Sequence, residues 1–271
     1  MALDSTTSLS AAELAIYLVA LPPTIWLLFK HGRRAFLAYL YLTIFETLRI
    51  VAGALQISAH NEHKFSASGA ILDSVGLSPL LLASAGFLHE LKGYRTTTTS
   101  EKQLVFIEVA VIHFGAMTGV ALAAVGASNL TKAGATEADI NSAHRLQEIG
   151  SVILLITWAV LGYLSFQLYR SLGATEKFGN LMVAAYPFVG IRAVYSVVYA
   201  FDHSPAVNPI TGGFAIKFIL IFLVQLITVM LLLSVGFLTR DIVSQHGLRK
   251  WGPPRSSRDV EFSAIPLNSP K

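Results

Sequence analysis

The sequence predicts an all-α membrane protein, a bundle of seven transmembrane helices with its N-terminus on the lumenal or outer side and its C-terminus in the cytosol. Of its 271 residues, 54% are hydrophobic and only 13% are charged, whereas a soluble domain carries about 25% charged residues. The apolar residues also come in blocks close to the ~20 residues that cross a bilayer as a helix. Lysines and arginines gather between alternate blocks, which predicts the orientation.

Seven apolar blocks follow one another along the chain, each bounded by polar or basic residues. The first has neither the basic start nor the small-residue cleavage site of a signal peptide, so we expect it to remain as a span. The predicted spans are residues 11–29, 35–58, 67–89, 103–126, 146–169, 179–201 and 213–238. Residues 239–271 are polar and contain Pro253-Pro254 and several arginines, so we expect a disordered cytosolic tail.

The distribution of basic residues between the spans is strongly one-sided. Fourteen lysines and arginines lie in the first, third and fifth loops and in the tail, against three in the loops of the opposite side. The positive-inside rule puts the group of fourteen in the cytosol. Asn129-Leu130-Thr131 is then a glycosylation sequon on the lumenal side. We expect a multi-pass protein of the endoplasmic reticulum or another secretory-pathway membrane.

Ionisable residues inside the predicted spans are the most informative feature after the spans themselves. Each costs roughly 2.5–3.5 kcal/mol at membrane depth on insertion scales, so a chain that keeps several is expected to pair them or to use them. These residues are Glu46, Arg49, Asp73, Glu108, Arg192 and Lys217.

Helical spacing predicts that most of these groups face the inside of the bundle. Residues three or four positions apart share a helix face, so Glu46 and Arg49 lie on the same face as Tyr39. Arg192 likewise shares a face with Tyr195 and Tyr199. With Asp73 and Glu148 added from neighbouring spans, these side chains are expected to converge on a cavity between the midplane and the lumenal face.

Several function classes are excluded or disfavoured. The chain has no cysteine, which rules out disulfides, zinc thiolate sites and cysteine nucleophiles. It shows no metal-binding histidine pattern and no phosphate loop, so we expect neither a metal nor a cofactor. The net charge of +4 comes mainly from loops and tail, which favours a role in orientation over nucleic-acid binding. Lys217 lies too close to the end of its span for a retinal Schiff base.

A cavity of this composition suits acid-initiated chemistry on a lipophilic substrate. A carboxyl held away from water favours its protonated form, whereas a neighbouring arginine keeps a carboxylate ionised. Glu46 or Asp73 is therefore the candidate proton donor, and the other the anion or base. The rings of Tyr39, Tyr195 and Tyr199 are candidates to stabilise a developing carbocation.

Three segments resemble a family of fungal seven-helix membrane proteins, some of which are associated with membrane-bound terpene cyclases of meroterpenoid pathways. The segments are Phe45–Arg49, Asp73–Ala83, and Pro187-Phe188 with Arg192, Tyr195 and Ser196. The resemblance implies an isomerase that protonates the terminal epoxide of a prenylated, farnesyl-type aromatic and guides the cation into a ring. It also implies Glu46, Asp73 and Arg192 as the functional residues.

Other interpretations compete with an enzyme. Glu46 with Arg49, or Asp73 with Arg192, also fit structural clamps between helices. A seven-helix receptor shares the predicted topology, but the cytosolic loops are short and no Asp-Arg-Tyr-like signal ends the third span. A small-solute or proton transporter would use buried charges as a relay, yet no inverted repeat is visible. The sequence identifies no protein partner.

Overall fold

The computed structural model of the chain is helical wherever a regular element occurs among the residues it describes. Those residues are 5–31, 35–61, 69, 71–72, 75–95, 99–130, 134, 136–172, 177–202 and 213–251. No strand occurs among them. The helices are α1 (Ser5–His31), α2 (Phe36–Asn61), α4 (Leu77–Arg95), α5 (Thr99–Leu130), α6 (Glu137–Leu172), α7 (Lys177–Asp202), α8 (Phe214–Ile216), the π-helix η2 (Lys217–Leu223) and α9 (Val224–Trp251). The predicted all-α class is therefore confirmed.

Six helical stretches within the described residues are long and apolar enough to cross a membrane. They are α1, α2, α5, α6, α7 and the continuous run from α8 through η2 into α9. The remaining long helix, α4, is 19 residues long and lies among them. Its C-terminal turns carry His89, Glu90 and Lys92, which lower its mean hydropathy. Multi-pass membrane character is confirmed at this level.

Helix α4 is the centre of the bundle. It packs against α2, α5, α6 and α7, and almost every described side chain from Leu77 to Leu91 is buried. A helix that is buried on all sides has no lipid-facing stripe. Its leucines, alanines and serines are therefore all core residues, and the other helices are arranged around it.

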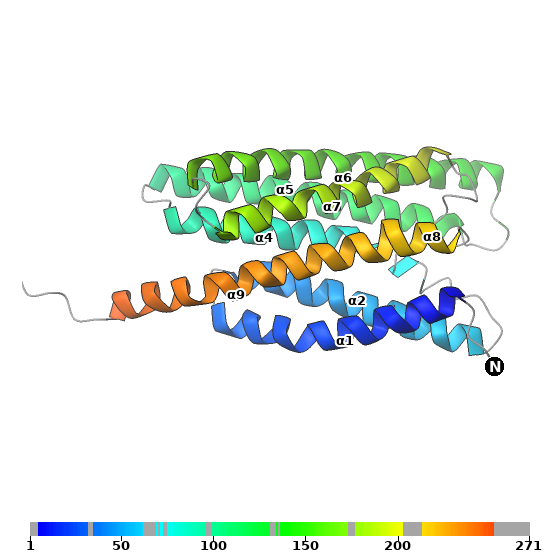
Figure 1. Cartoon of the computed structure of the whole chain (residues 1–271). Helices are drawn as coiled ribbons and strands as arrows, with labels where there is room; N and C mark the ends of the chain where they lie inside the picture. Colours follow the sequence, from blue (N-terminus) through cyan, green and yellow to red (C-terminus); the bar gives the residue numbers. More distant parts are fainter. Residues whose placement is uncertain are drawn as a thin grey trace, which may run out of the picture.

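The surrounding helices close around α4. In Figure 1, α1 and α2 form one side of the bundle, α5, α6 and α7 the other, and α9 crosses between them. The contacts agree, since α1 packs on α2, α5 on α6, α6 on α7, and α9 on both α7 and α1. The start of α1 and the end of α9 lie at opposite ends of the bundle (Figure 1).

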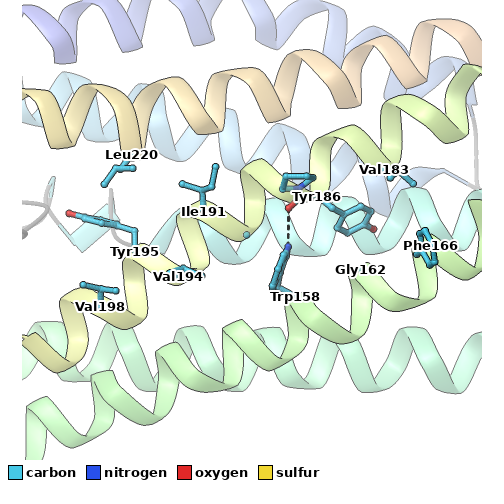
Figure 2. Close-up of a pocket in the computed structure, with 12 residues that line it drawn as sticks. Trp158, Gly162, Phe166, Val183, Tyr186, Ile191, Val194, Tyr195, Val198 and Leu220 are labelled. Carbon is cyan, nitrogen blue, oxygen red and sulfur yellow. Dashed lines mark hydrogen bonds between the residues drawn. The ribbon is translucent and has the colours of Figure 1, made fainter.

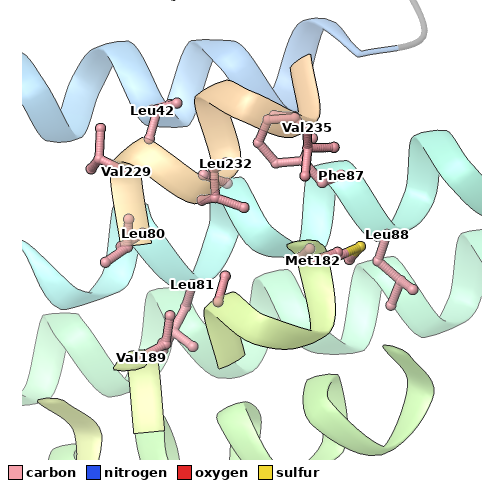
Figure 3. Close-up of a cluster of buried hydrophobic side chains, with 14 of the residues drawn as sticks. Leu42, Leu80, Leu81, Phe87, Leu88, Met182, Val189, Val229, Leu232 and Val235 are labelled. Atoms are coloured by element: carbon pink, nitrogen blue, oxygen red, sulfur yellow. The ribbon is translucent and has the colours of Figure 1, made fainter. Parts of the chain in front are cut away.

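A layer of aliphatic side chains joins four helices in the middle of the bundle (Figure 3). It consists of Leu42 from α2, Leu80 and Leu81 from α4, Val189 from α7 and Val229 from α9, each essentially inaccessible to solvent. We call these five residues the core layer. Because they come from four different helices, they fix the relative height of those helices.

Glycines allow the closest helix approaches. A Cβ on Gly150 of α6 would lie 2.6 Å from the carbonyl oxygen of Gly119 on α5, and one on Gly86 of α4 would lie 2.6 Å from the backbone of Ala38 on α2. Real Cβ atoms do not approach backbone this closely. Small residues at these crossings let the backbones touch, as is common in membrane helices.

Most helices extend beyond the predicted spans by a few residues at their ends, and two larger differences concern α4 and α9. The third span was expected at residues 67–89, but α4 begins at Leu77, with Pro79 in its first turn, where proline is tolerated; residues 67–76 are described only in part. The last span was expected at residues 213–238, which agrees with the apolar stretch Phe214–Thr239, and the tail from residue 239 was expected to be disordered. Instead α9 continues to Trp251, because the chain stays helix-compatible until Gly252 precedes two prolines. Residues 252–271 lie outside the described residues.

Two glycines on α6 give a matched test of this packing. We expect Gly150→Ala to lower the free energy of unfolding by about 1–3 kcal/mol, since its methyl group has to push α5 away. A Cβ on Gly162 meets nothing within 4 Å, so Gly162→Ala should be neutral or slightly stabilising. Thermal unfolding of the two purified variants in detergent measures the difference, and equal midpoints would contradict the close α5–α6 contact.

Candidate functional site

Three polar side chains form a second layer, one turn beyond the core layer and nearer the end of the bundle where α1 begins. Each is three or four positions from a core-layer residue of its own helix, which is about one helical turn. They are Glu46 on α2, Arg192 on α7 and Gln225 on α9, and all are buried. We call them the polar layer. The inward orientation predicted for Glu46 and Arg192 is therefore confirmed.

On one side of the bundle, polar groups link α1 to α2. Nη1 of Arg49 lies 3.6 Å from Oε2 of Glu13, an ion pair between two buried side chains. The hydroxyl of Thr24 donates a hydrogen bond of 2.8 Å to Oε1 of Glu46. The other carboxyl oxygen of Glu46 has no hydrogen-bond partner among the described residues. One oxygen of a fully buried carboxyl is thus available to carry a proton.

On the other side, a cavity of about 60 Å³ opens beside Arg192. Nη1 of Arg192 donates a hydrogen bond of 2.6 Å to the hydroxyl of Ser196, and its Cζ lies 5.2 Å from the ring centroid of Tyr195. The polar residues lining the cavity are Gln147, Ser151, Arg192, Tyr195, Ser196 and Tyr199. They are mostly hydrogen-bond donors, and no carboxylate is among the described residues of the lining. The cavity therefore suits an oxygen-bearing group of a few atoms, since a water molecule occupies ~30 Å³ in the liquid.

A much larger apolar groove of about 770 Å³ lies between α6 and α7. Figure 2 shows Phe166 and Val183 near one end, and Tyr195 and Val198 near the other, with Leu220 of η2 across from Tyr195. Pockets that hold drug-sized ligands measure about 300–1,000 Å³. The groove is therefore large enough for the body of a lipophilic molecule.

The wall of the groove is held by specific contacts around Trp158. Its indole Nε1 donates a hydrogen bond of 3.0 Å to the carbonyl oxygen of Tyr186 (Figure 2), next to Pro187. A Cβ on Gly190 would overlap the indole ring, so glycine is needed there for α6 and α7 to meet. The Tyr186 hydroxyl in turn accepts a hydrogen bond of 2.6 Å from Ser165.

Tyr195 belongs to both spaces. It is one of the residues that line the apolar groove and also one of those that line the polar cavity. Its side chain is buried, and the guanidinium of Arg192 lies over its ring. The groove on the outer surface and the cavity inside the bundle thus share Tyr195, and no other described residue lines both.

The structure groups some predicted site residues and separates others. Tyr195, Tyr199 and Arg192 meet at the cavity, whereas Glu46 and Arg49 lie at the α1–α2 interface. Tyr39 lines neither the cavity nor the groove. Its hydroxyl oxygen lies 3.4 Å from Nε2 of His31.

Four further residues singled out in the sequence are not among the described residues that line the cavity. Glu148 is half-buried on α6, where its neighbours Gln147 and Ser151 line the cavity. Asn129 is next to the last residue of α5, and its glycosylation stays a prediction. Asp73 lies outside the described residues. Glu108 pairs with Lys92 of α4.

Sequence reasoning missed two buried polar residues. Glu13 lies near the start of its span and looks interfacial by position, yet it is buried and supplies the partner of Arg49. Gln225 carries no charge, so a count of ionisable residues passes over it. It is fully buried, and neither of its side-chain polar atoms has a hydrogen-bond partner among the described residues. The common signal is a lone amide or carboxyl inside an apolar block.

The sequence model of one protein family, described as a domain of unknown function (DUF7702), matches residues 3–242. The chain belongs to the DUF7702 family. The matched region spans every helix from α1 to α7 and most of α9, so the polar layer, the cavity and the groove are all parts of the DUF7702 domain. No curated protein and no solved structure matches the chain.

The donor set of this DUF7702 domain does not suggest a metal centre. Among the described residues, no group of three or more histidine, aspartate and glutamate side chains is placed to hold an ion. What the arrangement offers is a cation and hydroxyls for an oxygen-bearing group, an apolar groove for a hydrocarbon, and a buried carboxyl.

The Glu13–Arg49 pair can be tested by a double-mutant cycle. Removing one partner of a buried ion pair leaves an uncompensated charge, which costs about 3–5 kcal/mol. We therefore expect Glu13→Gln and Arg49→Met each to lower the free energy of unfolding markedly, and the double variant to lose less than the sum. Lys92→Met is the control, since Lys92 and Glu108 are partly exposed and should matter less. Additive losses in denaturant unfolding would show that the two residues do not interact.

Proposed function

We propose that this protein is a membrane-bound isomerase that cyclises a lipophilic substrate, opening the epoxide of a prenylated, farnesyl-type aromatic by acid-initiated carbocation chemistry. We further propose that its N-terminus is lumenal, its C-terminus is cytosolic and its membrane is that of the endoplasmic reticulum or another secretory compartment. The charge asymmetry of the loops supports this orientation.

The observation that carries the proposal is the shared position of Tyr195 in groove and cavity. A prenyl chain requires an apolar space of several hundred cubic ångströms, and the groove, at about 770 Å³, supplies it. An epoxide or carbonyl oxygen requires donors at the end of that groove, and the guanidinium of Arg192, which Ser196 helps to hold, supplies them. Tyr199 also lines the cavity, and an aromatic ring there is proposed to stabilise positive charge on carbon.

The proposed reaction begins with a proton donated by an acid and ends with the release of a proton. A carboxyl group donates its proton to the epoxide oxygen, the carbon–oxygen bond breaks, and positive charge develops on the more substituted carbon. The π electrons of a neighbouring double bond then form a carbon–carbon bond. Loss of a proton from the product cation restores a double bond and the proton balance. The substrate is isomerised, and no oxidant or reductant is consumed.

Two carboxyls remain candidates for the acid. Glu46 is fully buried, and one of its oxygens is without a partner among the described residues, but it lies at the α1–α2 interface and lines neither the cavity nor the groove. Asp73 comes two positions before Val75 in the sequence, and Val75 lines the cavity. Arg192 and Ser196 are the groups proposed to hold the oxygen-bearing end of the substrate, and Tyr195 and Tyr199 to contact it.

Conservative removal of each carboxyl separates the two candidates. In membranes of a heterologous fungus that expresses the chain, supplied with an epoxidised farnesyl-aromatic, we expect the acid's amide variant, Glu46→Gln or Asp73→Asn, to lose about 10²–10⁴-fold in cyclisation rate. The other variant should retain most of its rate. Product is measured by mass spectrometry against the same membranes without the protein.

Two results would remove the proposed mechanism. One is normal turnover in both amide variants. The other is an absence of cyclic product across several epoxidised substrates from a chain that is well expressed and folded. If such a substrate stabilised the protein against heating without being converted, a ligand-binding receptor would be the better description.

A further inference from the structure

The apolar groove between α6 and α7 opens on the outer surface of the bundle. Ile191, Val194 and Val198 of α7 and Phe166 of α6 line it, and each keeps roughly half of its surface accessible. On a helix that crosses a bilayer, such a surface faces hydrocarbon. A molecule dissolved in the bilayer therefore reaches this groove without passing through water.

We infer that the groove is a lateral binding site, filled from within the bilayer by a lipophilic chain whose oxygen-bearing end passes Tyr195 and meets the donors around Arg192. The inference deepens the proposed function, since it assigns a place and an access route to the lipophilic substrate. Its class is a single hydrocarbon or prenyl chain that ends in a hydrogen-bond acceptor.

The division of polarity between the two spaces identifies this class of ligand. The groove offers an apolar wall. If the wall were the whole site, the acyl chains of bulk lipid would fill it equally well. The cavity offers a guanidinium at membrane depth, which bulk hydrocarbon cannot engage. Hydrogen bonds to a charged group are stronger than those between neutral groups. A chain with an acceptor at its end therefore gains binding free energy from the guanidinium, and a plain hydrocarbon does not.

Tyr195 lines both the groove and the cavity. Its ring is held by the guanidinium of Arg192, one turn away on the same helix, and it lies across from Leu220 of η2 (Figure 2). A ligand that occupies both the groove and the cavity therefore contacts this ring, since no other described residue lines both. Tyr195 is therefore a positioning residue for the ligand's polar end.

The groove also offers a position at which it can be blocked without disturbing the core. Gly162 lines it from α6, and a Cβ there meets nothing within 4 Å. A leucine at this position grows into the groove. Val160, two positions earlier on the same helix, is exposed and is not among the residues that line the groove. Val160→Leu therefore changes the surface of α6 outside the groove.

The test uses a long-chain fatty acid that carries a photoreactive diazirine, with a diazirine-bearing alkane of equal length as the headless comparison. Each is added to the full chain in lipid nanodiscs, irradiated and mapped by peptide mass spectrometry. We expect the fatty acid to label α7 at Val194–Val198 at least tenfold more than the alkane. Gly162→Leu should abolish the preference and Val160→Leu should keep it. Arg192→Gln should lower labelling by the fatty acid about tenfold and leave the alkane unchanged.

The outcomes separate a binding site from a bilayer surface. Equal labelling by fatty acid and alkane, or equal labelling in Gly162→Leu and Val160→Leu, would mean that the groove holds bulk lipid only, and would overturn the inference. Because labelling needs no turnover, it also separates this inference from the proposed reaction. Selective labelling without cyclisation would remove the enzyme and keep the site, whereas cyclisation in Gly162→Leu at the normal rate would remove the groove as the route.

Discussion

The complete burial of α4 is the constraint on which the rest of the bundle depends. A helix with no lipid-facing side has to be covered by protein along its length, and it is covered by α2, α5, α6 and α7. Its small and aliphatic residues let these neighbours approach closely, as at Gly86 against Ala38. The heights of the surrounding helices follow from this contact, and the core layer is their common level.

The polar layer has physical meaning because it lies directly beside that apolar level. Polar groups at membrane depth have to find partners inside the protein. Gln225 keeps both of its polar atoms without a partner among the described residues, and the other groups are divided between two places. The α1–α2 interface takes the Glu13–Arg49 pair and the Thr24–Glu46 hydrogen bond, and the α7 side takes Arg192 with Ser196 and Tyr195. The first arrangement joins helices, whereas the second leaves a space.

The sequence predicted the features that depend on solvent and failed on those that depend on neighbours. Apolar blocks and helical period were enough to place the helices and to turn Glu46 and Arg192 inward, because both follow from the exclusion of charge from lipid. They were not enough to pair Arg49 with Glu13, since that requires knowing that α1 packs on α2. Tyr39 shares a helix face with Glu46 but lies beside His31. The two residues are seven positions apart, so they differ in height by about two turns. A face prediction does not include this difference in height.

The groove itself had no signal in the sequence. It depends on the meeting of α6 and α7 at Trp158 and Gly190, which single-helix patterns do not contain. The helix end at Trp251 was also missed, because falling hydropathy marks the edge of an apolar block and not the end of backbone hydrogen bonding.

The π-helical stretch Lys217–Leu223 has a consequence for how this region changes over evolution. A π turn accommodates one residue more than an α turn, so it corresponds to a one-residue insertion in a helix. Deleting one residue there would restore α geometry without turning the flanking parts of the helix, because the wide π turn absorbs the extra residue. Phe214, before the turn, would keep its face, and only residues within the turn, such as Leu220 in the groove, would shift. Length variation at this one position would therefore alter the groove locally without any substitution in α6 or α7.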